Sequence, residues 1–154
     1  SYHRALAEYF SGVSSGNQTL QGNNDIASDR AITIQKIYSD PQNSHGDGSD
    51  RVYNLRALNE LPFHFMKCQM TTQLKQSCLF NYEWMLARLC GTSLESLLEE
   101  YQLYLLAEPG DPEVRVLFDT LLLSSKALRH EPRQLASHII GRLYRIVTAD
   151  NPKA

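Results

Sequence analysis

The sequence lacks the patterns that typify membrane spans, nucleic-acid binding and nucleotide binding. No uninterrupted apolar run reaches the ~20 residues that a membrane-spanning helix needs. The net charge is -2, which supplies no basic footprint for nucleic acid. Neither GxxxxGK[ST] nor GxGxxG occurs, so the two common phosphate-binding loops are missing. We therefore expect no membrane, nucleic-acid or nucleotide partner for these residues.

Cysteine is scarce, and its spacing excludes a disulfide framework. The chain has three cysteines, Cys68, Cys78 and Cys90, an odd number without a CxxC pair. This usage is typical of a reducing compartment, and it predicts a cytoplasmic location. Zinc sites need closely spaced ligand pairs, and the sequence offers none. Each cysteine lies in or beside an apolar helical pattern, which predicts three small buried side chains.

No catalytic or metal-binding constellation is evident. His64 and Cys68 lie one helical turn apart, but a metal site would need further ligands, so packing or capping is favoured for His64. Glu95, Glu99 and Glu100 resemble paired carboxylates, yet solvated helix charges are the favoured interpretation, with no apolar surroundings expected to raise a pKa. The sequence thus predicts no catalytic, cofactor-binding or metal-binding residue, and no enzyme.

Length and composition are those of one globular domain, alone or with a tail. The chain has 154 residues, of which 42% are hydrophobic and 21% charged. It has no initiator Met and no signal peptide, and it opens inside a helical pattern. We expect a segment of a longer protein.

The sequence divides into four parts. Residues 1–11 form a helical pattern, and residues 51–148 form a helical domain followed by a linker at residues 149–154. Between them, residues 12–50 are rich in Gly, Asn, Ser and Asp, which predicts a flexible polar insertion. Within that insertion, residues 31–38 are β-prone and could form a short strand or an extended surface segment.

The helical domain predicts an all-α fold, an irregular bundle or α-α superhelix of about six to seven helices with one long polar loop. Helix starts are indicated at Asn81, at Thr92 or Ser93, and at Asp111 before Pro112. Apolar residues recur at helical spacing. Pro62 lies inside this pattern, and it either kinks its helix or starts a new one. The predicted core residues are Leu58, Leu61, Pro62, Phe65, Trp84, Leu97, Leu98, Tyr101, Leu121 and Ile139.

Four short stretches resemble a known family. Residues 3–10 read HRALAEYF, residues 58–65 read LNELPFHF, residues 79–84 read LFNYEW, and residues 96–101 read SLLEEY. They look like the segment that follows the nucleotide-binding module in the NACHT and WD repeat domain-containing family of signalling NTPases. A more distant similarity is to the second helical domain of the apoptotic protease-activating factor.

This resemblance implies a helical arm between a nucleotide-binding, winged-helix module and a WD40 propeller. Residues 1–11 would then be the end of the winged-helix region or the first helix of the arm. The arm would couple the switch to the propeller and contribute to autoinhibition or assembly. It would hold no cofactor, because ATP would bind an upstream domain. Its partners would be the adjoining domains of the same chain, with further protein partners or self-assembly.

Two other classes remain open on the residues. A free-standing helical-repeat module would bind proteins through a concave face, and an exposed apolar groove would favour it. An enzyme or metal protein built on a helical bundle would be detected by metal analysis of the purified chain.

Overall fold

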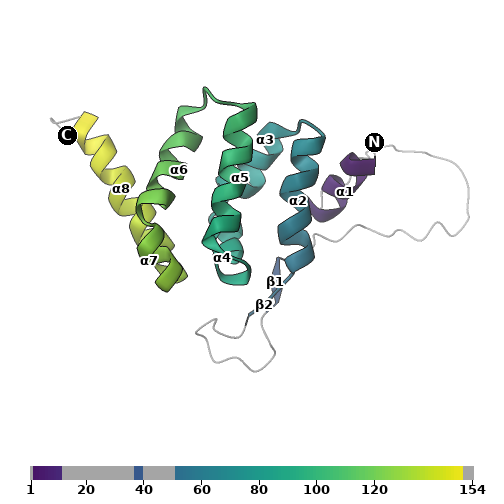
Figure 1. Cartoon of the computed structure of the whole chain (residues 1–154), viewed down its shortest axis with the longest axis horizontal. Helices are drawn as coiled ribbons and strands as arrows, with labels where there is room; N and C mark the ends of the chain where they lie inside the picture. The colour runs from purple at the N-terminus through teal and green to yellow at the C-terminus, as the bar shows by residue number, and fades with distance from the viewer. Residues whose placement is uncertain (1, 12–36, 40–50, 151–154) are drawn as a thin grey trace, which may run out of the picture.

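A computed structural model describes residues 2–11, 37–39 and 51–150 of the chain (Figure 1). Over these residues the fold is all-α, as predicted. The first elements are α1 (Tyr2–Ser11), the strands β1 (Tyr38–Ser39) and β2 (Val52–Tyr53), α2 (Leu55–Lys67), α3 (Thr71–Leu74) and the π-helix η1 (Lys75–Leu79). Then follow α4 (Tyr82–Gly91), α5 (Leu94–Ala107), α6 (Pro112–Leu123), α7 (Ser125–His130), the 3-10 helix η2 (Pro132–Gln134) and α8 (Leu135–Asp150).

Eight α-helices lie in the described residues, against the six to seven expected. The higher count reflects two short helices, α3 and α7. Ser124 ends α6, and α7 begins at the next residue, so an apolar pattern that looks continuous in sequence is divided in space.

The helices follow one another across the molecule in chain order. Figure 1 shows α1 and α2 at one end and α8 at the other, with α5 and α6 between them. Packing agrees with this order, because α1 contacts α2, α5 contacts both α4 and α6, and α8 contacts α6 and η2. A central helix such as α5 therefore has neighbours on several sides, whereas α8 is the last helix of the stack.

Side-chain caps fix three of the helix starts that the sequence indicates. The Asn81 side chain accepts from the Trp84 backbone N–H at 3.2 Å, and Ser93 Oγ accepts from the Ser96 N–H at 3.1 Å. Asp111 Oδ1 accepts from two N–H groups of α6 at 3.1 and 3.2 Å. Each such cap stabilises its helix by about 1 kcal/mol, since it satisfies N–H groups that have no helical partner.

Pro62 lies inside α2 and is buried. The alternative that it starts a new helix is wrong, because α2 is one helix from Leu55 to Lys67. The ring removes one helical hydrogen bond and crowds the preceding turn, so the expected kink at Pro62 stays a prediction.

Two strands of two residues each, β1 and β2, pair beside the helices. Tyr38 pairs with Tyr53 in antiparallel register, and the Asn54 N–H donates to the Ile37 carbonyl at 2.8 Å. A Cβ at Gly91 would lie 2.9 Å from the Tyr53 Cβ, so glycine is what lets β2 approach the end of α4. The β-prone stretch at residues 31–38 is described only at its end, where Tyr38 begins β1. Residues 31–36 of this stretch lie outside the described residues, as do the remainder of residues 12–36 and residues 40–50 and 151–154.

The core runs through the stack as one apolar cluster. Of the predicted core residues, the structure buries all but one and leaves Ile139 half-buried; the buried ones are Leu58, Leu61, Pro62, Phe65, Trp84, Leu97, Leu98, Tyr101 and Leu121. The half-burial of Ile139 reflects its place on α8, at the end of the stack.

The prediction for the cysteines is only partly right. Cys78 is buried, Cys68 is half-buried and Cys90 is exposed. Cys90 lies near the end of α4, beside Tyr53 of β2, where it remains exposed.

Candidate functional site

The inner face of α5 contains a buried ionic cluster that the sequence did not predict. Glu100 is 4% exposed, so its assignment as a solvated helix charge is wrong. Its carboxylate accepts from Trp84 Nε1 at 3.1 Å and pairs with Arg88 Nε at 2.5 Å. Arg88 Nη1 also donates to Asn59 Oδ1 at 2.5 Å. We call Trp84, Arg88 and Glu100, with Leu97 and Tyr101 beside them, the seam.

Helical spacing explains why Glu100 is buried. It stands three residues after Leu97 and four before Tyr104, which are both buried, so all three share one face of α5. Glu95 and Glu99 lie on the outer face and are exposed, as predicted. The helical spacing of Glu100 therefore indicated burial, but the prediction relied on its acidic side chain and placed it at the surface.

Burial raises the pKa of Glu100 to about 7, and this outweighs the lowering by Arg88 and by the Trp84 N–H. A carboxyl group with such a pKa would suit acid–base chemistry if a substrate could reach it. Beside it, the buried Tyr101 hydroxyl donates to the Leu79 carbonyl at 2.5 Å. Because Glu100 is enclosed by these groups, its position supports a structural role.

His64 packs against α1. Its Nδ1 lies 3.0 Å from Nδ1 of His3, and its ring stacks on Phe10 at a centroid distance of 6.4 Å. Burial, and then the neighbouring His3, lower the pKa of His64. Among the described residues, no three His, Cys, Asp or Glu side chains gather closely enough to hold a metal ion. His64 therefore serves to hold α1 on α2.

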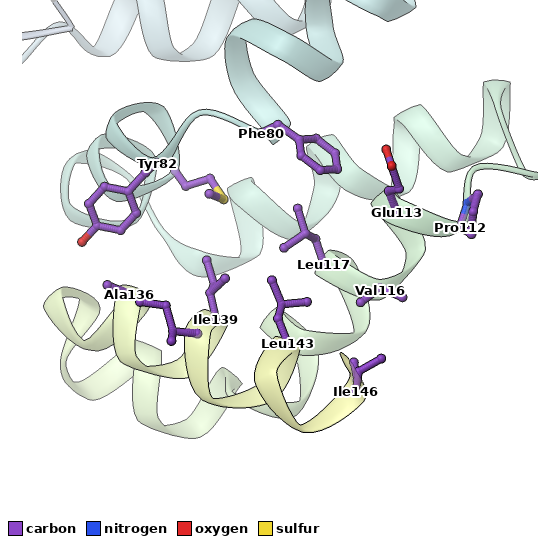
Figure 2. Close-up of a pocket in the computed structure, with 12 residues that line it drawn as sticks. Phe80, Tyr82, Pro112, Glu113, Val116, Leu117, Ala136, Ile139, Leu143 and Ile146 are labelled. Atoms are coloured by element: carbon purple, nitrogen blue, oxygen red, sulfur yellow. The ribbon is translucent and has the colours of Figure 1, made fainter. Parts of the chain in front are cut away.

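An apolar groove of about 740 Å³ opens beside α8. We call it the α6–α8 groove. One wall is a stripe along α8 formed by Ala136, Ile139, Ile140, Leu143 and Ile146. Figure 2 shows Ile139 and Leu143 pointing across the groove toward Leu117 of α6. Of this stripe, Ile140 is 68% exposed, although it is a large apolar side chain.

The rest of the lining comes from earlier elements. The first half of α6 contributes Pro112, Glu113, Val116 and Leu117 (Figure 2). Phe80, Tyr82 and Met85, from the region where α4 begins, also line the groove. Glu113 is the one charged residue among these lining side chains. The groove therefore offers apolar surface rather than reacting groups, and each Å² that a partner covers contributes roughly 25 cal/mol.

One end of the groove is charged. Pro112 and Glu113 also border a second hollow, together with Lys75, Glu108 and Asp111. Lys75 Nζ lies 2.7 Å from Asp111 Oδ2 and 2.8 Å from Glu113 Oε2, and these two contacts raise the pKa of the ammonium group. One ammonium and three carboxylates line this second hollow, which gives it a net negative charge.

Comparisons with known proteins give a distant similarity. The chain is 30% identical over 149 residues to the NACHT domain- and WD repeat-containing protein 1 of Mus musculus, an alignment that covers 92% of the chain. It is 29% identical over 155 residues to the Homo sapiens protein of the same name, with 96% of the chain covered. The chain spans 9% of the length of each relative. No protein-family model and no solved structure matches it.

The similarity to these relatives agrees with the family resemblance seen in the short motifs, and it extends over most of the chain. It concerns a small part of a much longer protein in each case. In the described residues, no helix has both the length and the apolarity needed to cross a membrane.

Proposed function

We propose that the chain is a non-catalytic helical arm of a multidomain signalling NTPase of the NACHT and WD-repeat type. It couples a nucleotide-switched module to a β-propeller in the cytoplasm, and it contributes to autoinhibition or assembly. ATP binds the upstream module, and the arm itself holds no cofactor. The distant similarity to two proteins with NACHT domains and WD repeats in their names supports this assignment.

The observation that carries the proposal is the α6–α8 groove. Contiguous exposed apolar surface is unfavourable in water unless something covers it, so it marks docking surfaces. The groove lies at the end of a stack whose other helices are packed on one another. An arm built in this way moves as a rigid body and transmits position through contacts at its ends.

The parent gene gives the first test. A P-loop sequence upstream of Ser1 and WD-type repeats downstream of Ala154 are expected. The absence of both would overturn the proposal.

The second test compares two variants of the parent protein. Ile140→Asp places a carboxylate in the groove, whereas Leu106→Asp, at an 80% exposed position of α5, is the matched control. Hydrogen exchange of α6 and α8 and the assembly state are measured for both. We expect faster exchange and altered assembly for Ile140→Asp alone. If Ile140→Asp behaves like the control, no domain docks in the groove.

A free-standing helical interaction module is the second candidate, and the same groove favours it. The two candidates differ in the flanking sequence: a free-standing module would bind its partner without neighbouring NTPase and propeller domains.

A further inference from the structure

We propose that the occupant of the α6–α8 groove is an amphipathic helix whose apolar face ends in a lysine or arginine beside Glu113. The inference rests on the proposed docking function and adds the chemistry of the partner.

The shape of the groove fits a helix. Its stripe on α8 runs from Ala136 to Ile146, which spans ~15 Å or about three helical turns at 1.5 Å per residue. A docked helix places side chains at i, i+3, i+4 and i+7 into such a groove. The groove walls are helices, whose backbone groups bond within themselves, so they offer an extended peptide no strand edge to pair with.

The charge at one end selects the partner's flanking residue. Glu113 is 68% exposed, and Lys75 is already engaged with both Glu113 and Asp111. Glu108 accepts only a long hydrogen bond from Thr71 Oγ1, at 3.5 Å. An ammonium or guanidinium group arriving here meets an excess of carboxylates, whereas an arriving carboxylate is repelled. Complementary rim charges of this kind set specificity and association rate.

The opposite end of the groove is different. Ala136 and Tyr82 line it there (Figure 2). Among the residues that line the groove itself, the only charge is therefore the carboxylate of Glu113, and we expect an incoming helix to place its basic end there.

A selection experiment reads the partner's chemistry directly. A displayed library of 16-residue helical peptides is selected on the complete 154-residue chain and counter-selected on the Ile140→Asp variant. We expect enriched peptides to carry apolar residues at helical spacing, with Lys or Arg at one end of that stripe.

An enriched peptide is then titrated by fluorescence polarisation against four forms of the chain. Ile140→Asp is expected to weaken binding at least tenfold, since it charges the groove wall. Glu113→Gln is expected to weaken binding about two- to fivefold at low salt, the usual size of an exposed ion pair, with a smaller effect at high salt. Glu99→Gln, at an exposed carboxylate of α5 outside the groove lining, serves as the control and should bind like the wild type.

The outcomes separate the two proposals. Peptides that depend on Ile140 but show no basic bias and no response to Glu113→Gln would overturn the charge inference and leave groove docking in place. A library that yields no Ile140-dependent peptide would overturn both. A wild-type chain that dimerises through the groove, and becomes monomeric as Ile140→Asp, would make a second copy the occupant and would also overturn the inference.

Discussion

The seam and the α6–α8 groove have similar apolar side chains but differ in how much of them is exposed to solvent. Both are lined by large apolar side chains at helical spacing on neighbouring helices. Trp84, in the seam, is 2% exposed, whereas Ile140, in the groove, is mostly open to solvent. The difference comes from position in the stack, because α5 packs against both α4 and α6, whereas α8 is the last helix (Figure 1). Even a glutamate is enclosed in the seam, while isoleucine remains exposed at the end of the stack.

The largest expected effect is the loss of the seam's indole. Trp84→Ala should lower the free energy of unfolding by ~3–5 kcal/mol, because it opens a core cavity and leaves the Glu100 carboxylate without its N–H donor. Chemical denaturation monitored by circular dichroism measures the change. Leu106→Ala, at an exposed site, should change stability by less than ~0.5 kcal/mol. If Trp84→Ala lowered the free energy of unfolding as little as Leu106→Ala does, the indole of Trp84 would not be buried in solution.

The second expected effect is a pH dependence of the free energy of unfolding, caused by Glu100. The pKa of Glu100 is about 7 in the folded chain, against an ordinary value of 4.5, so between these values the folded state binds more protons than the unfolded state. The contribution of Glu100 therefore makes the free energy of unfolding fall, by about 2–4 kcal/mol, as the pH rises from 4.5 to 7. Above pH 7 this contribution is constant.

Glu100→Gln isolates that contribution, since the amide oxygen still accepts from Trp84 but does not titrate. Denaturation midpoints between pH 4.5 and 8 should show a smaller downward slope for Glu100→Gln than for the wild type. Glu99→Gln should keep the wild-type slope. Equal slopes for the wild type and Glu100→Gln would show that the carboxyl titrates normally.

A smaller pH effect of opposite sign is expected at α1. Because the pKa of His64 is lowered from 6.5, the unfolded chain takes up the proton first as the pH falls. The contact between α1 and α2 should therefore weaken below about pH 6.5. Hydrogen exchange of the α1 amides at pH 5.5 and 7.5 measures this, and His64→Gln should reduce the difference. His130→Gln, at an exposed site, should leave it unchanged.

The smallest expected change in stability is that of a substitution in the groove. In the isolated chain, Ile140→Asp should alter the free energy of unfolding by less than ~0.5 kcal/mol, since this side chain is mostly in water already. Leu97→Asp, in the seam, should instead destabilise the chain, because it buries an unpaired charge. A large loss of stability for Ile140→Asp would mean that the groove is closed in solution.

The fold class and the helix starts were accessible from the sequence because they depend on local rules. Asn81, Ser93 and Asp111 each cap a helix through their own side chains, and the nearby N–H groups they bind lie within three residues. The burial of Leu97 and Tyr101 likewise follows from the 3.6-residue period.

The same period pointed to the burial of Glu100, but the groove and the pairing of Glu100 with Arg88 were not accessible in this way. Arg88 and Glu100 meet across two helices, and charged residues are expected at the surface unless their partner is known. Ile140 continues the apolar pattern of α8, and nothing in that pattern says that no helix packs over it. Both features depend on which helix packs where, which the order of the stack decides.

The position of Trp84 in the seam also determines what the intrinsic fluorescence of the chain reports. The chain has one tryptophan, and its indole N–H is bonded to the carboxyl group whose protonation changes near neutral pH. Intrinsic tryptophan emission therefore reports on a single buried place, without any label. The groove has Tyr82 but no tryptophan among its lining residues. Its link to the seam is Met85, which lines the groove and also accepts from the Tyr101 hydroxyl at 3.2 Å. A change in the tryptophan emission on docking would therefore mean that contacts behind the groove lining had shifted.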